Sequence, residues 1–422
     1  MRIAVLSDLH LGFSYTEETE NDSFENAEEA IEKALDCDLI LIAGDIFDSR
    51  VPKTSVWAKA MKVLVKPLLK ESTGLKLVYC SKVLKDISKR TLSHLPVVAI
   101  HGTHERKGKS EINAVEALEN AGILIYLNQD TIVFEKDGKK VAIHGMGNVP
   151  ERYAKDFLDS WNPKPLEGCF NILLLHQNIE PFVYSPLEPP TLNLSNLPRG
   201  FDLIVNGHIH CSGQEKIEDT ILIFPGSTIV TQFEKNEALI EKGFFKIELK
   251  EKIEIKFEKL TKNRKFFYEE VELKGGEGRE KIEEVIKKII SKEIPKPPLI
   301  KIKLVGKAEI SDQEIREIEK KFSGKALISI AKELEKEEMI KKVEFLREAR
   351  ERRLSIEEIG LNILRKNLEE LGFSFNFDFE SIFNLLSEGE TEKVFKILVG
   401  EQTTLQNVLE KPKNKVLQRW IK

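Results

Sequence analysis

The sequence predicts an α/β protein with a layered sheet domain, then a small α+β domain, then a helical tail. Three observations predict this order. Short, uninterrupted apolar runs alternate with amphipathic helical stretches up to about residue 245. Strand-like and helix-like patterns follow to about residue 325, and the remainder is highly charged with helical periodicity. We therefore predict three domains, at residues 1–245, 246–325 and 326–422.

The apolar runs of the first domain are typical of buried strands. They are rich in branched apolar residues and have no polar interruptions, which indicates strands covered on both faces. The runs are residues 3–6, 39–43, 97–100, 141–143, 172–175, 203–205 and 221–224. Helical patterns lie between them, for example at 25–35 and 110–120. This alternation favours a layered α/β sheet.

The second domain has a different pattern. Residues 252–257 alternate strictly between charged and apolar, as a half-exposed strand does. A helix is predicted at 279–292 and another strand at 299–305. Ser311 and Glu314 form a capping-box signature in front of a further helix. Together these elements predict a small α+β domain.

The tail carries two predicted amphipathic helices, at 354–371 and 382–398. The charged run before them, 333–353, is typical of a solvated helix or linker. Two short helices have little core of their own, so their apolar faces require another surface. Two interpretations stay open: the tail docks on a partner protein, or it packs on the preceding domain.

The composition fits a globular protein without membrane spans. Of the 422 residues, 41% are hydrophobic and 32% charged, and no apolar run approaches the ~20 residues that cross a bilayer. The first ten residues do not form a secretory signal, so we expect a cytoplasmic protein. The net charge of −5 means that any binding to nucleic acid needs a local cationic patch or a bound metal.

The four cysteines are scattered and form no C-x-x-C pair. This spacing excludes both a disulfide scaffold and a thiolate zinc site. We expect each thiol to be a small buried side chain in a reducing compartment. The residues are Cys37, Cys80, Cys169 and Cys211.

Polar side chains follow five of the predicted strands directly. The segments are Asp8-Leu9-His10, Gly44-Asp45-Ile46-Phe47-Asp48, Gly102-Thr103-His104-Glu105, His176-Gln177-Asn178 and Gly207-His208-Ile209-His210. In an open α/β sheet the carboxyl ends of the strands line one crevice, so we expect these side chains to converge.

This convergence predicts a metal centre. A single histidine after a strand is more often a hydrogen-bonded turn residue, but a carboxylate or an imidazole at every one of these ends makes a set of metal ligands. Oxygen and imidazole ligands without thiolate suit manganese, iron or zinc. Asp45 could bridge two ions through its two oxygens, at the ~3.5–4 Å spacing of two-metal phosphoryl hydrolysis.

These motifs resemble those of the calcineurin-like metallophosphoesterases. More narrowly, the chain resembles the Mre-eleven nuclease family (SbcD in bacteria) of DNA double-strand-break repair. The narrower likeness rests on Asp8 to Gly12, Leu174 to Asn178, His144 to Gly147 with Pro150-Glu151-Arg152, and Pro225 to Thr228 followed by Glu237-Ala238. The likeness rests on many sequence motifs over residues 1–245. Beyond residue 245 it rests only on the order of the domains.

The resemblance implies a fold and a set of site residues. The fold would be an α/β sandwich with a DNA-binding capping domain and a helical tail. The first metal would be held by Asp8, His10, Asp45 and His210. The second would be held by Asp45, His176, His208 and the residue at position 103. His104 would be the catalytic histidine that stabilises the phosphate or protonates the leaving oxygen.

Thr103 departs from the family pattern, which usually has asparagine there as a ligand to the second metal. A hydroxyl is shorter and a weaker neutral donor. We therefore predict weaker occupancy of the second site than of the first. Equal, tight binding of two metals would contradict this.

Other residues receive more ordinary interpretations. The long segment between Asp45 and His104 contains an extra stretch, 75–92, that is expected to add a strand or helix and to alter substrate access or self-association. We expect His94 on a surface loop, and His101 and His144 at strand ends, where they either support the metal ligands or pack in the core. For residues 105–107 a contact with a DNA backbone and a solvated loop stay equally open.

The family resemblance implies an Mn²⁺-dependent DNA nuclease with two Mn²⁺ per chain. Its activities would be 3′-to-5′ double-strand exonuclease and single-strand endonuclease. It would work as a homodimer with a Rad-fifty-type coiled-coil ATPase, on which the tail helices would dock. The alternatives are a small-molecule phosphodiesterase or phosphatase with the same metals, and a non-enzymatic scaffold in which Thr103 has cost the activity.

Overall fold

The computed structural model describes residues 1–332, apart from 109–110, 184–191, 274–277 and 307–309, together with residues 381, 382, 385 and 393. The chain divides into two compact units. The first is Met1–Arg106 with Ile112–Leu334, and the second is Lys107–Glu111 with Glu335–Lys422. The predicted helix at 354–371, and most of the one at 382–398, lie outside the described residues.

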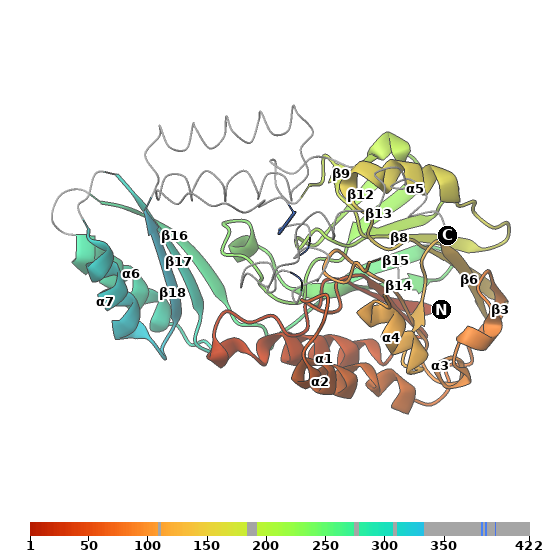
Figure 1. Ribbon diagram of the computed structural model, residues 1–422, viewed down its shortest axis with the longest axis horizontal. Coiled ribbons are helices and arrows are strands. Elements are labelled where there is room, and N and C mark those ends of the chain that lie inside the picture. Colours follow the sequence, from red (N-terminus) through yellow and green to blue (C-terminus); the bar gives the residue numbers. More distant parts are fainter. Residues whose placement is uncertain are drawn as a thin grey trace. The chain divides into compact units, whose positions relative to one another are not determined.

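A six-stranded sheet forms one half of the core (Figure 1). β1, β2, β4 and β5 run parallel, and β14 and β15 extend the sheet antiparallel beyond β1. In spatial order the strands are β15 (Ile253–Lys259), β14 (Gly243–Leu249), β1 (Arg2–Leu6), β2 (Leu39–Ala43), β4 (Val97–Ile100) and β5 (Ile125–Tyr126).

A seven-stranded sheet forms the other half. Its order is β12 (Gly213–Ile217), β13 (Thr220–Phe224), β11 (Leu203–Asn206), β8 (Phe170–Leu175), β7 (Lys139–Gly145), β6 (Asp130–Lys136) and β3 (Lys76–Cys80). β13, β11, β8 and β7 are parallel. The stretch 75–92 adds the edge strand β3, which pairs with β6, and the short helix α3 (Lys89–Ser93). The prediction that it adds a strand or helix is confirmed.

The two sheets pack face to face and helices cover their outer faces, which gives four layers. Side chains such as Val5, Leu41, Ile143 and Leu174 fill the space between the sheets. α1 (Asp22–Ala34), α2 (Thr54–Leu64) and α4 (Ala114–Asn120) cover the outer face of the six-stranded sheet, and α5 (Ala154–Trp161) covers that of the other. The predicted strands and the α/β class are confirmed, because uninterrupted apolar runs bury both strand faces.

A three-stranded parallel sheet follows the core. It consists of β16 (Phe266–Glu272), β17 (Leu299–Val305) and β18 (Leu327–Lys332). α6 (Gly278–Ile290) and α7 (Asp312–Phe322) connect these strands and share one hydrophobic core with them. The predicted capping box forms, since Ser311 Oγ accepts a hydrogen bond from the Glu314 amide. We call this region, residues 266–332, the cap.

The strand pairing does not follow the predicted domain boundaries. β14 spans the boundary at 245, and the predicted strand at 252–257 is β15, which pairs with β14 in the core sheet rather than with the cap. β18 begins after the predicted boundary at 325 but pairs with β17 of the cap. Since strand pairing joins these segments to their sheets, we propose boundaries at 260–265 and after 332.

The remaining elements are short. They are β9 (Ile179–Glu180), β10 (Leu192–Asn193) and the 3₁₀ helices Glu17–Thr19, Lys66–Leu69, Leu84–Asp86, Glu151–Tyr153, Leu194–Asn196 and Glu237–Leu239. Within the described residues, no helix is long and apolar enough to cross a membrane. All four cysteines are free thiols, but only Cys37 is buried and the others are half-buried, so the expectation of four buried thiols was wrong.

Candidate metal centre

The carboxyl ends of strands from both sheets meet at one place. β1, β2 and β4 of the six-stranded sheet lead into Asp8, Asp45 and His104. β8 and β11 of the seven-stranded sheet lead into His176 and His208. The strand ends that converge here therefore come from both sheets of the sandwich rather than from one open sheet. Apolar runs reveal burial, but they do not reveal which sheet a strand joins.

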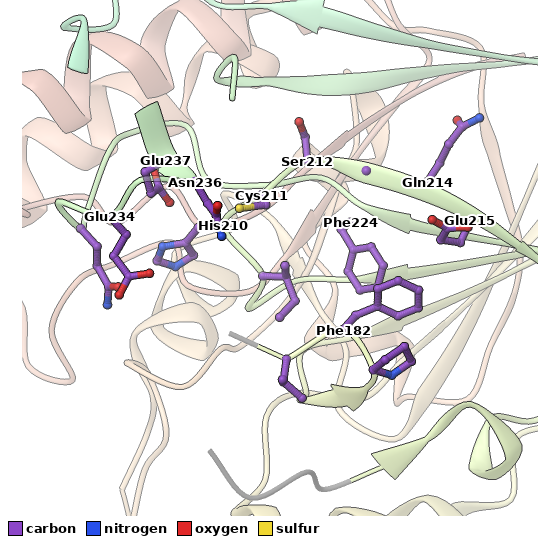
Figure 2. Close-up of a pocket in the computed structure, with 15 residues that line it drawn as sticks. Phe182, His210, Cys211, Ser212, Gln214, Glu215, Phe224, Glu234, Asn236 and Glu237 are labelled. Atoms are coloured by element: carbon purple, nitrogen blue, oxygen red, sulfur yellow. The ribbon is translucent and has the colours of Figure 1, made fainter. Parts of the chain in front are cut away.

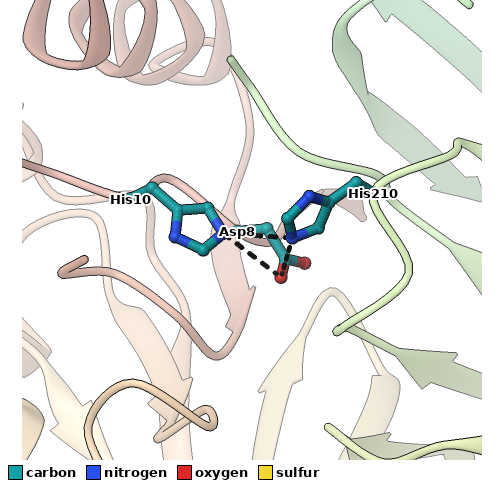
Figure 3. Close-up of side chains that lie close together, drawn as sticks. All are labelled: Asp8, His10 and His210. Carbon is teal, nitrogen blue, oxygen red and sulfur yellow. Dashed lines mark hydrogen bonds and ion pairs between the residues drawn. The ribbon is translucent and has the colours of Figure 1, made fainter. Parts of the chain in front are cut away.

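The first group of converging side chains is Asp8, His10 and His210 (Figure 3). His10 Nε2 lies 3.1 Å from His210 Nε2, and Asp8 Oδ1 lies 3.9 Å and 3.6 Å from these two nitrogens. All three residues are buried. We call them the first cluster.

The second group is Asp8, Asp45 and His176. His176 Nε2 lies 3.2 Å from Asp45 Oδ2, and the other Asp45 oxygen, Oδ1, accepts a hydrogen bond from the His104 amide at 2.9 Å. Asp45 also forms a group with His10 and His104, and in each group the ligand atoms lie within 4.8 Å of one another. We call Asp45 with His176 the second cluster. Asp45 thus lies close both to His10 and His104 and to His176.

A hydrogen bond to Nδ1 orients each of the buried imidazoles. His10 Nδ1 lies 3.2 Å from Asp48 Oδ1, His176 Nδ1 lies 2.7 Å from the Ala43 carbonyl, and His210 Nδ1 lies 2.7 Å from Thr231 Oγ1. In every case Nε2 is directed into the cluster. Metal-binding histidines characteristically have such partners, which fix the ring and its tautomer. Sequence reasoning missed the roles of Asp48 and Thr231, although Asp48 stood within the second motif.

The backbone at the centre is strained. Asp8, His10, Asp45 and His208 have φ angles of 51°, 45°, 49° and 73°. Non-glycine residues rarely adopt this left-handed conformation, and such outliers concentrate at functional sites. Gly102 permits the close approach of the next loop, since a Cβ atom there would lie 2.2 Å from Asp45 Oδ1.

Three predicted residues lie at the margin of the clusters. The His104 side chain is 43% exposed, its ring is T-shaped against His10 at 5.0 Å, and its Nδ1 lies 2.9 Å from the Asp48 carbonyl oxygen. The His208 ring lies 5.4 Å from that of His176. Thr103 Oγ1 is 3.4 Å from His208 Nδ1, so the hydroxyl is directed toward a histidine of the centre.

Glu105 is buried, contrary to a surface role at this position. One of its oxygens accepts the Phe47 amide at 2.8 Å and the other accepts the Gly102 amide at 2.9 Å. It therefore ties the loop after β2 to the loop after β4. Burial and then the nearby Asp45 charge raise the pKa of Glu105 to about 8.

The charges of the second cluster hold each other ionised. Burial lowers the pKa of His176, but the Asp45 charge and its hydrogen bond outweigh this and raise it to about 9. Burial raises the pKa of Asp45, yet the surrounding imidazoles, His176 first, bring it below its usual value. A carboxylate among cationic or metal-bound groups behaves in this way.

The other histidines contribute to packing. His101 Nε2 lies 3.0 Å from the Asn148 carbonyl oxygen, and the Tyr126 hydroxyl lies 2.8 Å from His101 Nδ1. Burial lowers the pKa of His101 to about 4, so it is neutral. His144 is buried and lies 2.9 Å from Thr131 Oγ1 through Nδ1.

A hollow of about 360 Å³ opens beside His210 (Figure 2). Phe182 and Phe224 form its apolar wall, with ring centroids 4.9 Å apart. Its polar rim includes Gln214, Glu215 and Glu234. The clusters therefore have a cavity of small-molecule size next to them.

Comparison with known proteins identifies the family. The model of the calcineurin-like phosphoesterases matches residues 1–212, half of the chain. The chain belongs to this family. The match covers every strand end that carries a cluster residue and confirms the predicted superfamily of metal-dependent phosphoesterases.

Curated relatives of this phosphoesterase are named as repair proteins. It is 27% identical over 271 residues to "DNA double-strand break repair protein Mre11" of Methanopyrus kandleri, covering 59% of this chain and 54% of the relative. It is 27% identical over 281 residues to "Double-strand break repair protein MRE11" of Arabidopsis thaliana, covering 56% of this chain and 38% of the relative. The matches thus span about half or less of these relatives. A solved structure, GAP50 of Plasmodium, has 16% identity and a TM-score of 0.36 over 61% of this chain and 84% of its own.

The residues of the phosphoesterase centre fit the divalent metal that the family implies. Asp8 Oδ2 accepts hydrogen bonds from Ser7 Oγ and from the His208 amide at 3.2 Å, whereas the buried Oδ1 has no hydrogen-bond donor. Two imidazole nitrogens 3.1 Å apart converge next to that oxygen. A buried oxygen without a donor is unfavourable unless a cation compensates it.

Proposed function

We propose that this phosphoesterase is a metal-dependent DNA nuclease that processes DNA ends in double-strand-break repair. The single observation that carries a phosphodiester-cleaving function is the proximity of the two clusters, since Asp45 of the second cluster also forms metal-ligand groups with His10 and Asp8 of the first. The choice of DNA as substrate is supported by the names of the curated relatives. We further propose Mn²⁺ as the metal, two ions per chain, and 3′-to-5′ exonuclease and single-strand endonuclease activities.

The proposed roles of the residues follow from their positions. Asp8, His10, Asp45 and His210 would hold the first metal, and Asp45, His176, His208 and Thr103 the second. Bound in this way, divalent cations polarise a phosphodiester and lower the pKa of bound water. His104 is half-exposed, and its Nδ1 lies 2.9 Å from the Asp48 carbonyl oxygen, which orients the ring. In the imidazolium form its Nε2 would protonate the departing oxygen.

The partners are part of the proposal. We infer a homodimer and a Rad-fifty-type ATPase bound through the region 354–398. The net charge of −5 is consistent with DNA contact through the metals and local groups rather than through overall charge. Deleting the residues after 350 should abolish binding of the ATPase and spare metal-dependent cleavage. A truncated chain that still binds the ATPase would refute this assignment.

The decisive experiment is a nuclease assay with hairpin and duplex DNA in Mn²⁺, with and without the ATPase. We expect cleavage that a chelator abolishes and that His104→Ala reduces by about a hundredfold or more, the usual contribution of a general acid. The matched control is His94→Ala, because His94 lies outside the centre with Nδ1 2.6 Å from the Lys70 carbonyl oxygen. Absence of DNA cleavage in every metal tested would contradict the proposal.

The hollow beside His210 favours a second candidate, a small-molecule phosphodiesterase with the same clusters. Its volume lies within the range of ligand-binding pockets. Parallel rates on DNA ends, cyclic nucleotides and bis-p-nitrophenyl phosphate separate the two candidates. Faster turnover of cyclic nucleotides than of DNA would favour the second. Absence of turnover on all three substrates would instead favour a non-enzymatic scaffold.

A further inference from the structure

A buried lysine lies behind the first cluster. Lys242 precedes β14 and is 1% exposed. Its Nζ lies 2.7 Å from Glu237 Oε2, donates to Ser227 Oγ at 2.8 Å and donates to the His210 carbonyl at 3.2 Å. Glu237 is itself buried and lines the hollow beside His210, as Figure 2 shows. The ammonium therefore contacts the backbone of a cluster residue directly.

The turn at 225–228 connects the same lysine to both sides of the first cluster. The Ser227 amide donates to the His210 carbonyl at 3.1 Å, and the Thr228 amide donates to the Asp8 carbonyl at 3.2 Å. Gly226 has a φ of 78°, and a Cβ atom there would lie 3.0 Å from the His210 oxygen. The turn thus links the backbones of Asp8 and His210, whose side chains face each other.

The energetic cost of this arrangement indicates a specific role. Removing an ammonium and a carboxylate from water costs several kcal/mol, and an apolar pair of similar volume is often equally or more stable. Stability alone therefore gives little reason for Lys242 and Glu237 at this place. What apolar side chains cannot supply is a second donor to the His210 carbonyl, in addition to the Ser227 amide. A weaker hold on that carbonyl would let the His210 ring move away from Asp8 and His10.

We propose that Lys242 is a positioning residue for metal binding at the first cluster. Together with Glu237 and Ser227 it fixes the His210 backbone, so that Nε2 stays directed toward Asp8 Oδ1. The second cluster has different supports: His176 Nδ1 contacts the Ala43 carbonyl, and its own carbonyl accepts the Asn148 side-chain amide at 2.6 Å. Loss of Lys242 should therefore weaken the first metal and leave the second unchanged. The inference rests on the proposed metal centre.

The test is calorimetric titration of the chelator-treated full chain with Mn²⁺, combined with thermal unfolding in chelator. The variants are made in two backgrounds, His176→Ala to retain the first cluster and His210→Ala to retain the second. Lys242→Met should weaken Mn²⁺ binding about 10–100-fold in the first background, the usual effect of losing an outer partner of a ligand, and have no effect in the second. The same affinity as the parent in a folded Lys242→Met protein would overturn the inference.

Two further variants separate positioning from stability. Lys242→Met with Glu237→Leu replaces the ion pair by an apolar pair and should recover the unfolding temperature without recovering the Mn²⁺ affinity. Recovery of both would show a merely structural role. This double variant also decides the question where Lys242→Met alone does not fold. Lys82→Met is the matched control, because Lys82 is also largely buried, with Nζ 2.7 Å from Glu119 Oε2 and 2.6 Å from the Tyr126 carbonyl.

Lys82→Met should lower the unfolding temperature and leave Mn²⁺ affinity unchanged, and an equal loss of affinity would count against Lys242. Mn²⁺ binding by the parent protein separates failure of the positioning role from failure of the metal centre. Failure of the parent to bind Mn²⁺ would refute the metal centre itself. Binding by the parent that is insensitive to Lys242 would refute only the positioning role.

Discussion

Two regions of the molecule bury carboxylates in opposite ways. Where α1 meets the segment before the cap, each buried oxygen has its own donor. Glu29 accepts the amides of Thr261 and Lys262 and the Thr261 hydroxyl, and Arg264 donates to both oxygens of Asp22 at 2.7 Å and 3.2 Å. At the metal centre, Asp8 Oδ1 has no donor and faces imidazole nitrogens. Carboxylates whose oxygens all accept hydrogen bonds stabilise the fold, and we call the region around Asp22 and Glu29 the saturated region. A buried carboxylate oxygen without a donor, next to converging imidazole nitrogens, instead indicates a metal ligand.

The largest expected effect comes from Asp8→Asn. The amide keeps an oxygen for Ser7 and the His208 amide but removes the negative charge from the first cluster. Hydrolysis of bis-p-nitrophenyl phosphate should fall by about a thousandfold or more, since metal activation supplies several kcal/mol. The unfolding temperature in chelator should not decrease. Asp219→Asn, at an exposed position, is the control. Equal losses of hydrolysis in both variants would contradict the role of Asp8 as a metal ligand.

Arg264→Leu tests the saturated region. Among the described residues, the substitution leaves Asp22 buried with Lys296 as its remaining cation, at 3.3 Å, and should lower the free energy of unfolding by about 3 kcal/mol. Chemical denaturation measures this change. Arg199→Leu is the matched control: its side chain is 87% exposed and pairs with Glu218 at 3.5 Å, so it should change stability by less than about 1 kcal/mol. Equal effects would show that burial does not distinguish the two pairs.

Glu29→Gln should cost about 2 kcal/mol at pH 7, with a defined pH dependence. Burial raises the pKa of Glu29, but the hydrogen bonds from Lys262, Thr261 and Lys33 outweigh it and lower the value to about 2. Because the folded pKa is depressed, the stabilisation is complete above the unfolded value of about 4.3 and is lost as the pH falls toward 2. The stability difference between wild type and variant should therefore shrink below about pH 4. A difference that grows in acid would refute the mechanism, and Glu28→Gln, at a half-exposed position, is the control.

The smallest effect is expected at Thr103. Thr103→Asn supplies an amide oxygen and should tighten the weaker of two Mn²⁺ binding events by about tenfold, or about 1.4 kcal/mol. Calorimetric titration measures this, with Thr103→Val as the variant that removes the hydroxyl. Two equal, tight events in the wild-type protein would contradict the prediction of unequal sites.

The sequence predicted the metal centre better than the saturated region, for a physical reason. Each cluster residue lies within five positions of the end of an apolar run, so local pattern alone places it near a strand end. Asp22 and Arg264 are 242 positions apart and both lie in charged segments that resemble solvent-exposed ones. A similar limit applies to Lys242: Glu237 is close in sequence, but Ser227 and His210 are 15 and 32 positions away and no local pattern indicates the contact. Sheet membership was equally inaccessible, because the alternation at 252–257 is compatible with either the core or the cap.

The origin of the first cluster in both halves of the sandwich has a mechanical consequence. Asp8 and His10 follow β1, while His210 follows β11 in the opposite sheet. A cation held by all three residues would link the two sheets of the sandwich at the carboxyl ends of these strands. Metal loading would then raise the temperature at which the halves separate, by an amount that grows with the logarithm of the cation concentration.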